Sequence, residues 1–247
     1  MRSTLTTLML FLCTILNAQI VGGPMLGPSG LRNIQVWVMT AGAEDDVVVN
    51  FWEASNENAG GMARKMTMPD YAVNNPSGYN ILKFECGGLE PGTAYKYRVR
   101  AKQADGKTQT RTGQFKTQTL FQWRQDAPDV HFITGSCLYM NEPKYDRPGK
   151  PYGGDSSILM PMAGENADLM LWLGDNWYTR DVDYTTPYGL WYRPAHDRSA
   201  PVIQPLLANT PNLAIWDDHD YGPNDYSSSY VLKDVSRQVF ESFWLNN

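Results

Sequence analysis

Hydrophobic and polar residues alternate along several short segments in the first half of the chain. These segments are residues 34–38, 47–52 (less strictly), 79–84 and 95–100. Turn-forming sequences separate them, namely Asn75-Pro76-Ser77-Gly78, Pro91-Gly92 and Asp105-Gly106. A period of two residues is typical of strands with one buried face, and regular short strands between turns favour a β-sandwich. We therefore expect an all-β sandwich over residues 19–118, followed by a linker over residues 119–129.

The hydrophobic pattern changes after residue 130. Residues 131–134 and 212–216 predict short strands, and the nearly continuous apolar run 169–173 is typical of a strand buried on both faces. Helices are predicted at 156–160, with Asp155 as the N-cap, at 202–207 and at 234–244. Strands that alternate with helices predict an α/β layer over residues 130–247.

The first 18 residues have the pattern of an export signal. Arg2 supplies a positive start, an apolar stretch follows, and the small Ala18 offers a cleavage site before Gln19. The apolar stretch is shorter than the roughly 20 residues that span a bilayer. We expect a signal peptide over residues 1–18 and a secreted or periplasmic protein. A buried N-terminal helix is the alternative, whereas bulky Phe11 and Leu12 disfavour a lipid anchor on Cys13.

Composition and charge narrow the class of protein. With 42% hydrophobic and 19% charged residues, the chain is expected to form a packed globular structure. A net charge of −5 gives no support for nucleic-acid binding and argues against electrostatic docking to an anionic membrane. No stable membrane insertion is expected, and the oligomeric state is left open. In an exported protein, one disulfide can form between Cys86 and Cys137.

Reactive side chains follow the three predicted strands of the second half. Cys137 follows the first strand, Asp175 the second, and Asp218 with His219 the third. Ligands of open α/β sheets bind outside the carboxyl ends of the strands, so these residues are expected to converge. Together with Asp217 and Asp220, the carboxylates repel each other unless a cation neutralises them. Carboxylates suit hard cations and a thiolate suits iron or zinc, so this mixed donor set suggests two different metals that share a carboxylate.

Two parts of the sequence resemble known families. The segment from Leu89 to Val99 resembles the corner of fibronectin type III domains, in which a tyrosine hydroxyl ties a turn to the following strand. The second resemblance rests on three stretches, residues 132–137, 173–178 and 216–225. With these stretches, residues 130–247 resemble the first half of a PhoD-like alkaline phosphatase/phosphodiesterase, a branch of the calcineurin-like metallophosphoesterases. It implies a multidomain protein, in which a fibronectin III-like sandwich precedes part of an α/β four-layer sandwich.

The PhoD-like resemblance also implies a chemistry. It implies a metal-dependent phosphoesterase that hydrolyses phosphate mono- or diesters by attack of a metal-activated water. The implied cofactors are Fe³⁺ and Ca²⁺, and the resemblance is also compatible with other divalent metals. A phospholipase-like diesterase would share the same motifs.

The family's roles transfer onto matching positions of this sequence. Cys137 resembles the iron-binding thiolate, Asp175 the carboxylate that bridges both metals, and Tyr178 the iron-binding tyrosinate. Asp218 stands where the wider superfamily has a metal-binding asparagine, and Asn224 is the alternative source of that amide. His219 resembles the histidine that contacts the phosphate and protonates the leaving oxygen. Asp217 and Asp220 are expected to orient His219.

The remaining histidines and nearby arginines are expected to lie outside the chemistry. His131 and His196 are predicted to be structural. The expected place of Arg180, Arg193 and Arg198 is the solvated surface.

The family pattern also has a part that this sequence lacks. None of the three histidines follows His219, so the later aspartate and histidine ligands of the family have no counterpart here. We expect residues 130–247 to be a C-terminally truncated catalytic domain, with the apolar strand 169–173 partly uncovered. The alternative function is a non-catalytic extracellular binding module or an inactive fragment.

Overall fold

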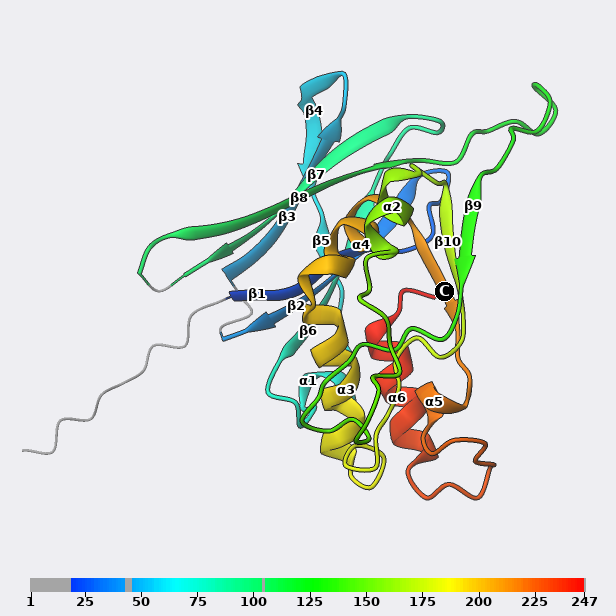
Figure 1. Cartoon of the computed structure of the whole chain (residues 1–247). Coiled ribbons are helices and arrows are strands. Elements are labelled where there is room, and N and C mark those ends of the chain that lie inside the picture. Colours follow the sequence, from blue (N-terminus) through cyan, green and yellow to red (C-terminus); the bar gives the residue numbers. More distant parts are fainter. Residues whose placement is uncertain (1–18, 43–45, 104, 247) are drawn as a thin grey trace, which may run out of the picture.

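Two four-stranded antiparallel sheets form the N-terminal part of the chain (Figure 1). The computed structural model describes residues 19–42, 46–103 and 105–246, so the predicted signal peptide lies outside the described residues. The first sheet has the order β1-β2-β6-β5, with β1 Gln19–Leu26, β2 Asn33–Ala41, β6 Asn80–Gly87 and β5 Arg64–Lys65. The second has the order β4-β3-β7-β8, with β4 Asn56–Met62, β3 Val47–Glu53, β7 Ala94–Lys102 and β8 Thr108–Lys116.

Alternating side chains give the two sheets a common core. Along β7 every second residue is buried, and the residues between them are exposed. Tyr95, Tyr97 and Val99 of this strand pack with apolar residues of β2, β3 and β6. The Tyr95 hydroxyl accepts a hydrogen bond from the Glu90 backbone N–H at 2.9 Å, so the predicted tyrosine corner is confirmed. All four predicted strands of this region are present.

Strand β1 and the short helix α1 (Asp70–Val73) are elements that the sequence pattern did not predict. The Gly22-Gly23-Pro24 stretch of β1 has the composition of a turn, and the ladder between β1 and β2 shifts register there. The edge strand β4 is largely exposed and polar, so it carries no apolar alternation.

A three-stranded parallel sheet forms the second part, with the order β11-β10-β9. Its strands are β9 Phe132–Gly135, β10 Leu169–Leu173 and β11 Asn212–Ile215, close to the predicted ranges. The helical elements are α2 Leu159–Gly164, α3 Pro187–Ser199, the 3-10 helix η2 Pro201–Ile203, α4 Gln204–Asn209, α5 Asp218–Tyr221 and α6 Lys233–Phe243. None of the helices in the described part of the chain is long and apolar enough to cross a membrane.

One predicted helix needs correction, and one long helix was not predicted. The predicted helix 156–160 begins later, at Leu159, because Asp155 caps a turn by accepting a hydrogen bond from the Ser157 N–H. Helix α3 was not predicted at all. It begins after Thr186, whose side chain accepts from the Gly189 N–H. It buries several polar residues and so shows no apolar stripe.

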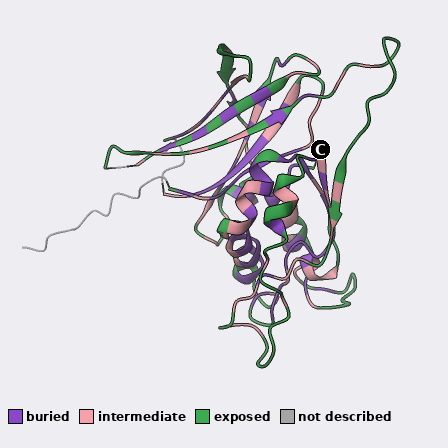
Figure 2. Ribbon diagram, turned by 45° about the horizontal axis from the view of Figure 1, so that its top comes forward, coloured by how far each residue is buried: buried purple, intermediate pink, exposed green. Residues whose placement is uncertain are grey.

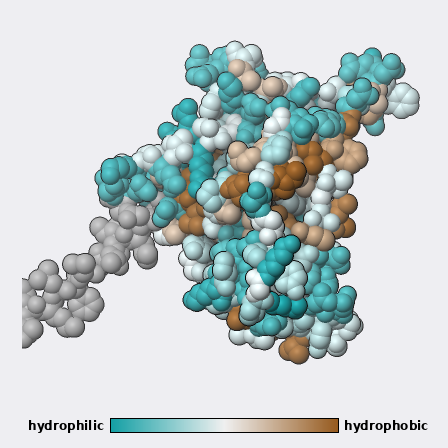
Figure 3. All heavy atoms as spheres, viewed as in Figure 1, coloured by the Kyte–Doolittle hydropathy of each residue, from teal (hydrophilic) through white to brown (hydrophobic). Residues whose placement is uncertain are grey.

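The parallel sheet is covered on one face only, which corrects the expectation of burial on both faces. Met170 and Trp172 are 0% and 3% exposed, whereas Leu173 on the opposite face is 48% exposed. Phe132 and Ile215 share that opposite face and are 53% and 59% exposed. In Figure 2, β9 is coloured as exposed and intermediate along its length, and hydrophobic residues gather over β9 and β10 in Figure 3. The prediction that strand 169–173 is partly uncovered is thus confirmed.

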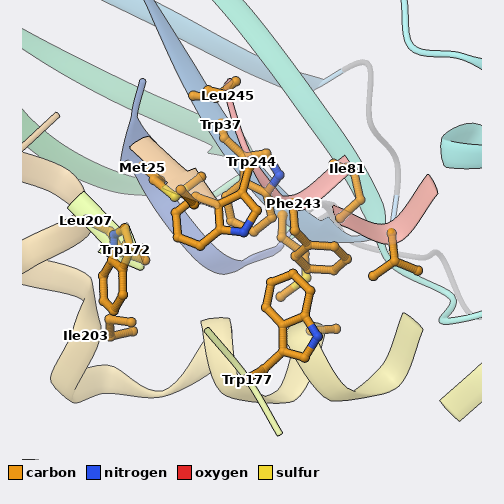
Figure 4. Close-up of a cluster of buried hydrophobic side chains, with 14 of the residues drawn as sticks. Met25, Trp37, Ile81, Trp172, Trp177, Ile203, Leu207, Phe243, Trp244 and Leu245 are labelled. Atoms are coloured by element: carbon orange, nitrogen blue, oxygen red, sulfur yellow. The ribbon is translucent and has the colours of Figure 1, made fainter. Parts of the chain in front are cut away.

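One hydrophobic core joins the first antiparallel sheet to the helical part. Met25, Trp37 and Ile81 of that sheet pack with Trp244 and Phe243 at the end of α6 (Figure 4). The Trp37 indole also donates to the Ser242 carbonyl at 2.9 Å. The predicted segments 19–118 and 130–247 therefore share a core rather than pack as separate bodies.

Candidate metal centre

The three parallel strands place the reactive residues that follow them at the carboxyl end of the sheet. The loops after β9 and β10 lie side by side, since the Cys137 N–H donates to the Gly174 carbonyl at 3.3 Å. The Leu138 N–H donates to the Asp175 carbonyl at 2.9 Å. Cys137 and Asp175 both have left-handed backbone conformations, with φ of 59° and 52°. These turns bring both side chains to the carboxyl end of the sheet.

Gly174 lets the loop after β11 approach the loop after β10. Its φ is +93°, and a Cβ there would lie 2.6 Å from the Asp217 Cβ. Asp220 then ties these loops together. Its carboxylate accepts from the Asn176 N–H and the Asp217 N–H, both at 2.9 Å. The Asp220 side chain is buried, and this burial raises its pKa to about 7.

The Asp175 carboxylate is the centre of the candidate site. Its Oδ2 accepts a hydrogen bond from the Tyr178 hydroxyl at 2.9 Å and lies 3.5 Å from the Cys137 Sγ. Its Oδ1 accepts from the His219 N–H at 3.4 Å. Ligand atoms of Asp175, Asp218 and His219 all lie within 4.8 Å of one another. The carboxylate thus has a thiol and a phenol on one oxygen, with a second carboxylate and an imidazole nearby.

This donor set fits a pair of cations. A cation beside Oδ2 would be held by Asp175, Cys137 and Tyr178, and a second cation by Asp175 and Asp218, with the His219 imidazole beside it. Burial, and then hydrogen bonding with Cys137 and Asp175, raises the pKa of Tyr178 above its ordinary value. The phenol is therefore protonated in the metal-free protein and would have to give up this proton to bind a cation.

The structure places Asp218 and Asn224, the two candidate ligands after β11, differently. Asp218 belongs to the close group around Asp175, and its Oδ2 also accepts from the Asp225 N–H. The Asn224 amide instead donates to the Asp225 carboxylate and lines a neighbouring cleft. Asp218 is therefore the better placed of the two.

Asp217 and Asp220 bond to backbone groups. The Asp217 side chain caps α5 by accepting from the Asp218 N–H at 3.0 Å. Together with the contacts of Asp220, this bond shapes the turn that presents Asp218 and His219. The His219 ring packs against Tyr178, with ring centroids 4.1 Å apart.

Comparison with solved structures shows which fold carries this site. One structure of PhoD matches with a TM-score of 0.62 and 21% identity, over 90% of this chain and 45% of that chain. The purple acid phosphatase PPD1 from yellow lupin (Lupinus luteus) seeds matches with a TM-score of 0.59 and 16% identity, over 92% of this chain and 40% of that one.

The chain has a PhoD-like phosphoesterase fold. It spans less than half the length of either of these structures. No family model and no curated protein sequence matches the chain.

The arginines of the PhoD-like fold lie elsewhere than predicted. Arg180, Arg193 and Arg198 are 7%, 0% and 1% exposed, so the expectation of a solvated surface is wrong for all three. Arg193 pairs with Asp183 at 2.7 Å, and the Arg198 guanidinium lies 4.1 Å from the centroid of the Trp244 ring. The fold brings these acidic and aromatic partners against the arginines, which the local sequence pattern does not reveal.

The two other histidines and Cys86 do not line the candidate site or its cleft. His196 is half-buried beside Asp197, and His131 is exposed. Cys86 and Cys137 are both free, with Cys86 buried in the sandwich core and Cys137 exposed at the site.

A cleft of about 220 Å³ opens beside His219 and Tyr178. Most of its lining residues were missed by sequence reasoning. They are Tyr139, Tyr145, Arg147, Tyr152, Thr179, Arg180, Asp181 and Tyr184. The tyrosine-rich composition of residues 139–152 was the available signal, but no known motif marks it.

Proposed function

We propose that this chain carries the metal-binding part of a secreted or periplasmic phosphoesterase that hydrolyses phosphate mono- or diesters. The observation that carries the proposal is the Asp175 carboxylate. A thiol and a phenol share one of its oxygens, and Asp218 and His219 lie beside it, at the strand ends of a PhoD-like fold.

Each residue of the site has a proposed role. Cys137 and Tyr178 would hold Fe³⁺, Asp218 would hold Ca²⁺, and Asp175 would bridge the two. Bound cations of this kind supply an activated water and neutralise charge on the phosphoryl oxygens. His219 would contact the phosphate and donate a proton to the leaving oxygen. The remaining coordination positions would be filled by water, substrate or further protein ligands.

Metal content and hydrolysis together test this proposal. The chain is incubated with Fe³⁺ and Ca²⁺, dialysed and measured for bound metal, and turnover is followed with p-nitrophenyl phosphate and its bis-ester. Asp175→Asn is expected to lose both cations, and His219→Ala to lower turnover by roughly 10²–10⁴-fold while iron stays bound. Retained turnover in both variants would contradict the proposal.

The matched control is Asp126→Asn, an exposed aspartate in the segment that joins the two parts of the fold. It should keep both metal content and turnover. A folded wild-type chain that binds neither iron nor calcium would favour a non-catalytic binding module instead.

A further inference from the structure

The cleft beside His219 has a wall of aromatic rings that begins at the candidate metal centre. The ring centroids of His219 and Tyr178 are 4.1 Å apart, those of Tyr178 and Tyr139 are 5.0 Å apart, and those of Tyr139 and Tyr152 are 5.6 Å apart. The wall thus leads from the proposed proton donor to a ring on the loop 139–152. Such faces attract planar groups by stacking.

The two arginines of the cleft differ in how far protein groups already engage their guanidinium donors. Arg180 is buried, pairs with Asp146 at 3.0 Å and donates to the Met140 carbonyl at 2.6 Å. Arg147 is exposed, and its Nη1 donates to the Tyr152 hydroxyl at 3.2 Å. Its guanidinium also lies 5.9 Å from the Tyr152 ring centroid. Arg147 therefore presents its remaining donors at the far end of the aromatic wall.

Asp181 also lines the cleft, and it bears on how Arg147 would act. Its carboxylate accepts a hydrogen bond from the Tyr184 hydroxyl at 2.5 Å. A ligand anion would thus meet Arg147 near a carboxylate that already has a partner. A comparison of the affinities for an anionic and a neutral aromatic ligand measures whether the charge of Arg147 or that of Asp181 dominates in the cleft.

We propose that this cleft holds the alcohol part of the phosphate ester, and that this part is a single aromatic ring with an anionic substituent bound by Arg147. The inference rests on the proposed phosphoesterase function. A volume of about 220 Å³ lies below the roughly 300–1,000 Å³ of drug-sized sites, which favours one ring over a longer group. Tyrosine and arginine walls also suit a planar anion better than an acyl chain.

Binding measurements test the cleft without relying on turnover. Methylphosphonate, phenylphosphonate and 4-carboxyphenylphosphonate are titrated into the metal-loaded chain by calorimetry. Phenylphosphonate should bind about tenfold more tightly than methylphosphonate, and the carboxylated ring more tightly again. Arg147→Met should abolish the preference for the carboxylated ring, and Arg147→Lys should restore part of it.

The controls separate this inference from the proposed function. Arg124→Met, the same change at an exposed arginine outside the cleft, should leave all three affinities unchanged. Benzoate is also titrated into the metal-free chain. Arg147→Met should weaken the binding of benzoate there, whether or not the chain hydrolyses phosphate esters. Equal binding of the methyl and phenyl ligands, an unchanged preference in Arg147→Met, or no binding of any probe would overturn the inference. The proposed function is tested separately, by the turnover of Asp175→Asn and His219→Ala.

Discussion

Cys137 and Asp175, two non-glycine residues of the candidate site, hold left-handed backbone conformations. Such conformations cost of order 1–3 kcal/mol each and persist only where the surroundings impose them. Here the hydrogen bonds between the two loops impose them, because Cys137 and Leu138 donate to the carbonyls of Gly174 and Asp175. Two of the six non-glycine residues with positive φ in the described part of the chain are thus residues that we propose as metal ligands.

Gly174→Ala should disrupt this arrangement. The new methyl group would lie 2.6 Å from the Asp217 Cβ at a φ of +93°, so the loop must move. We expect a loss of more than about 1 kcal/mol of stability, and therefore a lower thermal midpoint, together with weaker metal binding. Gly78→Ala is the matched control, because its φ is +78° but no atom lies within 4 Å of the added carbon. Equal losses in the two variants would show that the contact with Asp217 is unimportant.

At the residue scale, the sequence predicted which side chains meet but not how the rest of the site supports them. Cys137, Asp175 and Asp218 could be predicted because strand ends of a parallel sheet converge. The aromatic cleft and the burial of Arg180 could not be predicted. Both depend on loops, whose sequences have no regular pattern of hydrophobic and polar residues.

Helix α3 is held by buried charged residues as well as by Leu190, Trp191 and Ala195, which lie in the hydrophobic core. Arg193 pairs with Asp183 at 2.7 Å and with Glu142 at 2.8 Å. Glu142 also accepts a hydrogen bond from the Tyr192 hydroxyl at 2.6 Å, which connects α3 to the loop that forms the cleft. A hydrophobic pattern cannot predict such a helix, whereas α6, with its amphipathic sequence, was predicted to within a residue at each end.

His196 gives α3 a dependence on pH. A hydrogen bond with Asp197, at 2.8 Å from the His196 Nδ1, is the largest cause of a raised pKa of His196. Glu142 also raises this pKa, whereas burial and Arg193 lower it. Because the folded-state pKa is raised, the contribution to stability is fully present below about pH 6.5 and is lost as pH rises through the folded value.

We therefore expect His196→Gln to reduce the thermal midpoint more at pH 5.5 than at pH 8.5. Scanning calorimetry of the variant and the wild type at both values measures this difference. His131→Gln, at an exposed histidine outside α3, serves as the control and should leave the difference between the two pH values unchanged. A loss of the same size at both pH values would contradict the predicted role of His196.

The whole molecule presents an uncovered apolar sheet face. Phe132, Leu173 and Ile215 are exposed on the side of the parallel sheet opposite to Met170 and Trp172, which pack into the core with the helices. Parallel sheets are normally covered on both faces, so this surface favours association with other apolar surfaces.

The double variant Phe132→Lys with Ile215→Lys should bind less of an apolar-surface dye and self-associate less in sedimentation experiments. Its stability should stay within about 0.5 kcal/mol of the wild type, because both side chains are exposed. Met170→Lys, on the buried face of the same sheet, should instead prevent folding. Unchanged dye binding in the double variant would show that the sheet face is not the apolar surface in solution.

The shared core predicts how the molecule unfolds. Trp37 of the sandwich lies against Phe243, and Lys83 of β6 donates to the Glu241 and Trp244 carbonyls at 2.7 Å. We therefore expect one calorimetric transition for both parts of the fold. Two transitions separated by several degrees would mean that the sandwich and the helical part unfold independently.

The bond between the Trp37 indole and the Ser242 carbonyl spans 205 positions of the chain. During synthesis the ribosome delivers the sandwich strands well before the end of α6. The nascent sandwich must therefore wait, with Met25 and Trp37 exposed, until nearly the whole described chain has emerged. Over that interval its outer face is a surface for chaperones or for misassembly with neighbouring nascent chains.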